Sequence, residues 1–187
     1  MRRVYEIAPD NVRAVHVNQK SRDQEARDSI DMVRTSDVIE GVKKRDDSLL
    51  LQGGEHGGGE LSAFKSVMTG LPGAVMTKTL EVKNSGFISN VRFFTDGDDL
   101  LVNVSYNRAT VFFMGCHFEK NAKKVATFVE IAAGARVHFI GCSFYPMVNV
   151  GGALFSHTGA ITSVQVMSCS NTTGQTFGNC TDTATTT

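Results

Sequence analysis

One eight-residue phrase occurs three times in the second half of the chain and limits what it can fold into. Val111–Phe118 reads VFFMGCHF, Val137–Phe144 reads VHFIGCSF and Val164–Asn171 reads VQVMSCSN, so that successive cysteines lie 26 and then 27 residues apart. A looser copy, GFISNVRF, occupies Gly86–Phe93. A repeat of this period predicts a solenoid, in which coils stack and no single coil buries its apolar side chains alone.

Side chains alternate within each phrase as they do in a β-strand, and the alternation breaks at one position. That position is occupied by Asn90, Gly115, Gly141 and Ser168 in the four copies. Gly and Asn adopt a left-handed backbone at low cost. We therefore expect a bend there, between two short strands.

Superposition of the phrases predicts three inward columns of side chains. The columns are Ile88, Phe113, Phe139 and Val166; Val91, Cys116, Cys142 and Cys169; and Phe93, Phe118, Phe144 and Asn171. Three further segments, Leu101–Ser105, Thr127–Ile131 and Ala153–His157, recur at a similar spacing and would form another face of each coil. Stacked about 4.8 Å apart, such coils share one continuous core. The alternative is an antiparallel sandwich with coincidental spacing.

The repeated apolar-x-apolar-x-(Gly/Asn/Ser)-(Cys/Val)-x-Phe rung resembles the right-handed parallel β-helix of the pectate-lyase-like type, over roughly Thr35–Asn171. Thr35–Gly54 is similar to the opening of that family, with Asp37 and Glu40 as a helix capping box and Leu49–Leu51 as the first strand. The resemblance implies an all-β fold, a short right-handed single-stranded parallel β-helix with an N-terminal capping helix and an extended N-terminal arm.

The domain boundaries follow from changes in composition. Residues 1–34 form the arm, in which Gln19–Arg34 is charged and has few apolar residues. Residues 35–171 form the β-helix with its capping helix, and 172–187 form a C-terminal cap or tail. Nineteen basic and nineteen acidic residues leave no net charge, which argues against nucleic acid as a partner. No apolar run approaches the length of a membrane span and no signal-peptide pattern follows Met1, so we expect no membrane association.

The cysteines of the inward column are expected to be free, buried thiols. Their side chains would run parallel to one another, a poor direction for a disulfide, and their spacing fits no zinc pattern. Cys180 lies in the polar tail. The glycine-rich stretch Gly53–Gly59 lacks the Lys-Ser/Thr of a phosphate-binding loop and is expected to form an irregular first coil with a projecting loop.

The sequence contains no arrangement of residues that is typical of a catalytic site. Glu119 and Glu130 are the main outward acids, but they have no repeated acidic partner, and Ser156–His157 lacks a nucleophile elbow. The carboxylates of Asp96–Asp99 are expected to form a solvated turn, with calcium binding left open. We therefore predict no enzyme activity, no catalytic residues, no cofactor and no metal, and we interpret Glu119–Lys124 as an exposed basic loop.

The outward positions of the phrases form an apolar strip that suits a subunit interface. We predict an interface of Phe112, Met114, His138, Ile140, Gln165 and Met167, packed around a threefold axis. The arm would anchor the protein to a larger assembly through Arg2, Arg3, Tyr5, Val12, Val15 and Val17.

Small β-helices without an active site and with such an arm resemble structural proteins of bacteriophage virions. The resemblance implies a homotrimeric capsid decoration or cement protein, made in the host cytoplasm and bound at the virion surface to the major capsid protein or another virion protein. The alternatives are a tailspike or fibre module that binds a receptor or polysaccharide, a polysaccharide lyase or hydrolase, and a cellular assembly module. The tailspike hypothesis would use Tyr106, Tyr145 and the Asp96–Asp99 turn.

Overall fold

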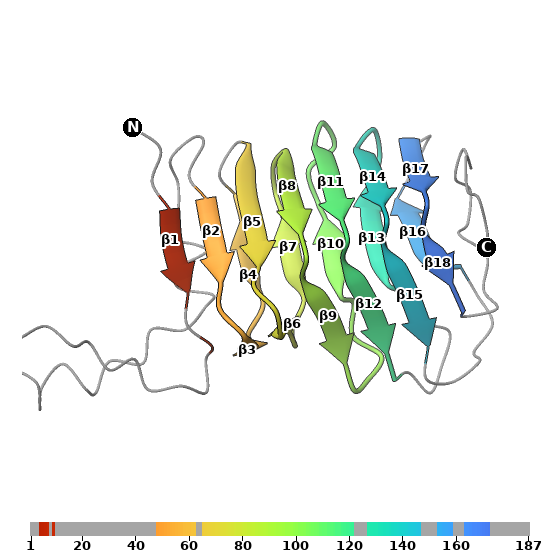
Figure 1. Ribbon diagram of the computed structural model, residues 1–187. Coiled ribbons are helices and arrows are strands. Elements are labelled where there is room, and N and C mark those ends of the chain that lie inside the picture. Colours follow the sequence, from red (N-terminus) through yellow and green to blue (C-terminus); the bar gives the residue numbers. More distant parts are fainter. Residues whose placement is uncertain are drawn as a thin grey trace, which may run out of the picture.

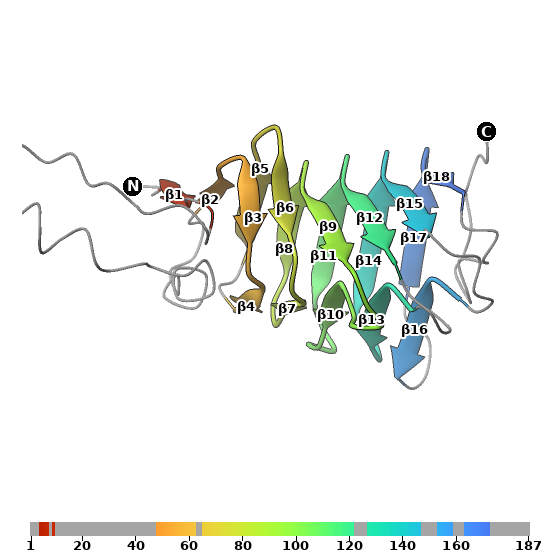
Figure 2. The ribbon, with the colours of Figure 1, turned by 90° about the horizontal axis from the view of Figure 1, so that it is seen from below.

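The chain folds into a parallel β-solenoid, seen in a computed structural model that describes residues 4–7, 9, 48–62, 65–121, 127–146, 153–158 and 163–172. Figure 1 shows its strands stacked side by side along one axis, and Figure 2 shows the same stack turned by 90°. Every strand pairing is parallel. The prediction of an all-β solenoid is confirmed, and the predicted capping helix lies almost wholly outside the described residues.

Each full coil contributes one strand to each of three sheets. Sheet A contains β1 (Val4–Ile7), β2 (Ser48–Leu51), β5 (Ser66–Gly70), β8 (Gly86–Ser89), β11 (Thr110–Met114), β14 (Arg136–Ile140) and β17 (Ser163–Met167). Sheet B contains β3 (Gly54–His56), β6 (Ala74–Met76), β9 (Arg92–Thr95), β12 (His117–Lys120), β15 (Ser143–Pro146) and β18 (Ser170–Asn171). Sheet C contains β4 (Gly59–Leu61), β7 (Leu80–Val82), β10 (Val102–Val104), β13 (Val129–Ala132) and β16 (Phe155–Thr158).

The bend between sheets A and B lies at the predicted position in four successive coils. Asn90, Gly115, Gly141 and Ser168 have φ angles of 54°, 59°, 60° and 52°. In this left-handed conformation the chain turns within one residue, and the amide nitrogen of Asn90, Gly115 or Gly141 donates to a carbonyl of the next coil. The break in the alternation of each phrase therefore comes from a left-handed backbone conformation, as the sequence predicts.

The core is built from columns of like side chains. Phe118 stacks between Phe93 and Phe144 with ring centroids 5.0 Å apart on both sides, and Phe113 stacks on Phe139 at 5.1 Å. All these rings are fully buried. Stacked pairs of this kind contribute about 1 kcal/mol each beyond the area that they bury. The strand register confirms the first and third predicted columns, and the members of the cysteine column are also buried.

The prediction of an irregular first coil at the glycine-rich stretch is wrong. This stretch supplies strands β3 and β4 of the first coil. Glycine is required there because neighbouring backbone comes very close: a Cβ on Gly58 would lie 2.0 Å from the carbonyl oxygen of Thr79, and one on Gly53 2.7 Å from that of Pro72. The glycines thus permit close stacking of coils rather than a projecting loop.

Lys120 is also not part of an exposed basic loop. It is the last residue of β12 and only 1% exposed, and its ammonium donates to the carbonyl oxygens of Asp98 (2.9 Å) and Thr127 (3.0 Å). Burial lowers the pKa of Lys120, with the acids Asp98 and Asp99 acting in the opposite direction. The lysine therefore ties two turns together from inside the coil.

Candidate functional site

The outer face of sheet A carries the largest part of the predicted interface. Phe112 and Met114 project outward from β11, His138 and Ile140 from β14, and Gln165 and Met167 from β17. Met114 and Met167 are 41% and 37% exposed, which is high for large apolar side chains. The structure thus places all six predicted residues on one face, in two adjacent rows.

His138 has a fixed position within this face. Its ring stacks on that of Phe112, with centroids 4.5 Å apart and planes inclined by 10°. Its Nδ1 lies 2.9 Å from Oε1 of Gln165, so that a proton on Nδ1 is donated to the amide oxygen. Three neighbouring strands therefore hold a preformed aromatic and polar cluster beside the exposed methionines.

The apolar face extends further toward the N-terminus than the sequence indicated. Register places Val67 and Phe87 in the row of Phe112, and Leu50 in the row of Met114, where Thr69 and Ser89 separate the two; the three apolar residues are half-buried. Leu50 and Val67 were missed because their coils do not contain the repeated phrase, and Phe87 because it lies in the looser copy, whose outward positions were not included. A rule that every second residue of each sheet A strand points outward would have found them. We call Leu50, Val67, Phe87 and the six predicted residues the apolar outer face.

The predicted anchoring arm is described only at β1 and at Pro9. Val4–Ile7 pairs in parallel with Ser48–Leu51, so Tyr5 lies beside Leu49 in the backbone register. No strand was predicted at these residues. Arg2, Arg3, Val12, Val15 and Val17 lie outside the described residues, and their anchoring role stays a prediction.

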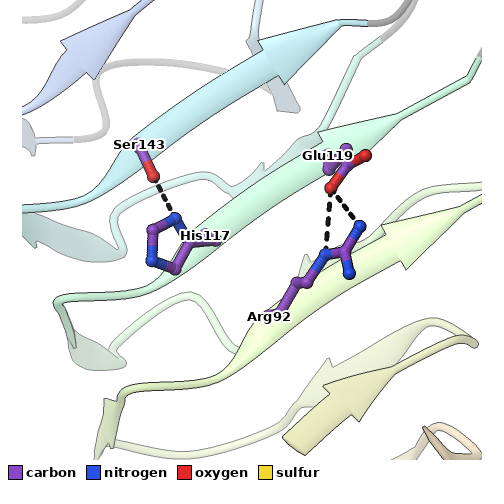
Figure 3. Close-up of polar contacts among 4 residues, drawn as sticks. All are labelled: Arg92, His117, Glu119 and Ser143. Atoms are coloured by element: carbon purple, nitrogen blue, oxygen red, sulfur yellow. Dashed lines mark hydrogen bonds and ion pairs between the residues drawn. The ribbon is translucent and has the colours of Figure 1, made fainter. Parts of the chain in front are cut away.

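The outer face of sheet B carries a polar network between coils, shown in Figure 3. Arg92 on β9 donates to Oε2 of Glu119 on β12 through Nε at 2.9 Å and through Nη2 at 2.5 Å. His117 Nδ1 and Ser143 Oγ are 2.5 Å apart, and the Ser143 side chain is buried. Glu119 is bound to Arg92, and no acid of the described residues is hydrogen-bonded to His117, so within that part of the chain this serine–histidine pair lacks the orienting third group of a nucleophilic triad.

Sheet C presents a row of acids that the sequence did not predict. Register aligns Glu60, Glu81, Asn103 and Glu130, so Glu60 and Glu81 are adjacent acids, while Asn103 separates Glu130 from them. Lys83 contacts Glu60 at 2.6 Å and Glu81 at 3.7 Å. Exposed ion pairs of this type contribute little to stability, and here one cation balances two neighbouring acids.

Metal-binding geometry is not found in the part of the chain that the structure describes, where no group of three or more His, Cys, Asp or Glu side chains could hold an ion. Asp96 accepts a hydrogen bond from Nδ2 of Asn121 at 2.5 Å. The Asp96–Asp99 turn is thus tied to the next coil through at least one of its carboxylates.

The three aligned thiols are free and buried, as predicted. The Cys142 amide donates to Sγ of Cys169 at 3.3 Å, and the thiols of Cys142 and Cys169 lie within 3.6 Å of backbone carbonyl oxygens. Hydrogen bonding to Cys116, reinforced by burial, raises the pKa of Cys142 to about 12. The pKa of Cys169 is also raised, through its hydrogen bond with Cys142 and through burial, so Cys142 and Cys169 are inert protonated thiols within the core. Burial acts to raise the pKa of Cys116 as well, but its hydrogen bonds with Cys142 and with the backbone outweigh this effect, so that the pKa of Cys116 is lowered.

Comparison with protein-family models, with curated proteins and with solved structures found no match for this chain. The fold alone therefore defines the class of this protein, which is a parallel β-solenoid with three sheets. No helix in the described part is long and apolar enough to cross a membrane.

Proposed function

We propose that the protein is a non-enzymatic structural protein that assembles with copies of itself through the apolar outer face. The single observation that supports this proposal is that face, which takes residues from all six strands of sheet A beyond β1 and includes two methionines more than one-third exposed. A contiguous apolar patch on a flat sheet recruits other molecules unless something covers it. Methionine side chains adapt readily to the packing of such a seam.

A closed trimer is the assembly that we propose. Sheet A has seven strands, so its stack is roughly 29 Å long at the usual strand spacing. A solenoid this short gains through association the burial that longer solenoids obtain from additional coils. Cyclic symmetry lets every copy bury the same face without growing into a filament.

The specific role that we propose is decoration of a bacteriophage capsid, with the major capsid protein or another virion protein as the second partner. This step rests on the resemblance of a small β-helix with a charged arm, an outward apolar strip and no recognised active site to virion structural proteins, and fold-level resemblance is an analogy. In this role the N-terminal arm, residues 1–34, would bind the shell and the solenoid would project from the virion surface. An image of a purified particle that shows the protein elsewhere would contradict it.

Light scattering of the full chain tests the self-association. We expect a mass three times that of the 20.2 kDa chain, and we expect Met114→Glu combined with Met167→Glu to give the monomer mass, because two carboxylates cannot be buried unpaired in the seam. Tyr106→Glu is the matched control, since Tyr106 is equally exposed but lies outside the apolar outer face. A monomeric wild-type chain would refute the proposal.

A further inference from the structure

The N-terminal edge of the solenoid contains a slot that holds an extended segment. Strand β2 would form the edge of sheet A, but β1 covers it along the register Val4↔Ser48 to Ile7↔Leu51. Two residues beyond β1, the buried Pro9 lies against Gly54, where a Cβ would come within 2.3 Å of its Cγ. The slot therefore has two parts, a strand edge with free backbone groups and a notch that only glycine leaves open.

The connection between β1 and β2 differs from the connections between the later strands of sheet A. Between successive strands of sheet A from β2 onward, the chain uses 14 to 22 residues and places strands in sheets B and C on the way. Between β1 and β2 there are 40 residues, and neither sheet B nor sheet C has a described strand before β3 and β4. β1 is thus a lone strand rather than part of a complete described coil.

The length of this connection allows the segment to reach a second molecule. Forty residues span roughly 35 Å even at random-coil dimensions, which exceeds the roughly 29 Å length of sheet A. Backbone pairing with β2 makes the same hydrogen bonds whether the strand comes from the same chain or from an identical one. Exchange of an identical element between copies therefore costs little.

We propose that in the assembled protein the segment Val4–Pro9 is exchanged, so that it fills the slot of a neighbouring copy of this chain. This inference rests on the self-association proposed above. A four-residue strand contributes little by itself, because an isolated short strand pairing is only marginally stable. In a closed ring each copy gives one strand and accepts one, and these contacts reinforce those of the apolar outer face because they form within one assembly.

Chemical crosslinking between two differently tagged chains tests the exchange. One chain carries Val4→Cys and the other Ser48→Cys, both with Cys180→Ser, because these two positions are register partners and a flexible bismaleimide joins two neighbouring thiols without the strict geometry of a disulfide. After co-expression and treatment with the bismaleimide, we expect a crosslinked band that carries both tags on a denaturing gel. Tyr106→Cys in place of Val4→Cys is the control and should give none.

The remaining outcomes separate this inference from the proposed function. A doubly substituted chain, Val4→Cys with Ser48→Cys, that only closes within itself while light scattering still shows a trimer overturns the exchange and leaves the self-association intact. Absence of any crosslink in all these chains also overturns it, since β1 would then not occupy the slot. A monomeric protein overturns both proposals.

Discussion

At the scale of single residues, the bend between sheets A and B separates two effects that glycine can have. Gly141 has a φ of 60°, and a Cβ there would meet nothing within 4 Å. Gly70 lies at the same corner, one coil before Asn90. Its φ is not left-handed, but a Cβ added there would lie 2.3 Å from the carbonyl oxygen of Asn90. One position needs glycine for its dihedral angle, and the other needs it for space.

Substitution by alanine at these two positions should therefore have different costs. We expect Gly141→Ala to lower the free energy of unfolding by about 1 kcal/mol, the strain of one left-handed residue. Gly70→Ala should cost about 3 kcal/mol, because backbone of the adjacent coil must move. Urea denaturation of both variants checks the order, and equal costs would contradict the close approach of the coils at Gly70.

The thiol column predicts how stability depends on alkaline pH. The pKa of Cys142 is about 12 in the folded chain against an ordinary value of 9.0, so folding favours the protonated thiol. A raised pKa contributes stability that is present below pH 9 and is lost as the pH rises toward 12. We expect the urea midpoint to fall across this range, and Cys142→Ala to reduce that fall. A midpoint with the same pH dependence in both proteins would show that the thiol is not shielded.

At the scale of the strand, adjacent residues of the same type have different roles, because side chains alternate between the inner and the outer face. On β9, Phe93 is fully buried and stacks on Phe118, whereas Phe94 faces outward beside the guanidinium of Arg92, 5.3 Å from its ring centroid. We expect Phe93→Ala to lower the free energy of unfolding by about 4 kcal/mol. Phe94→Ala should cost less than about 1 kcal/mol. Chemical denaturation measures both, and a reversed order would mean that β9 is rotated by one residue.

The same alternation explains how much of the fold was predictable from sequence. Cys116, Phe118 and Gly115 occur in a phrase that repeats, so their columns and their bend could be read directly. The first coil contains no copy of that phrase, and its glycines at Gly53 and Gly58 are explained only by the carbonyl groups that approach them. A single sequence does not show which distant backbone lies against a glycine.

The candidate site was predictable to a similar extent and for a similar reason. The two methionines and His138 were found because they belong to the phrase, while Val67 and the acidic row of sheet C required the strand register. Lys120 was misinterpreted because a lysine in a charged segment usually faces water. Here two carbonyl groups, of Asp98 and Thr127, receive its ammonium inside the coil.

At the scale of the whole molecule, the stack of coils produces three outer faces with different chemistry. Sheet A is apolar along most of its length, sheet B carries cross-coil polar pairs, and sheet C carries a row of acids. One solenoid can thus use one face for self-association and leave the other two in water. The slot at Gly54 adds an attachment point at the end of the stack, separate from all three faces.

The three outer faces and the slot all depend on the parallel stacking of the coils. A distance between two spin labels measures this stacking directly. Glu60 and Ser156 lie in one row of sheet C, separated by Glu81, Asn103 and Glu130. Four coil spacings place their backbones about 19 Å apart. Labels at Glu60→Cys and Ser156→Cys, diluted with unlabelled protein, should give a narrow distance distribution near that value. A distance well beyond about 30 Å, or a broad distribution without a maximum, would contradict the parallel solenoid.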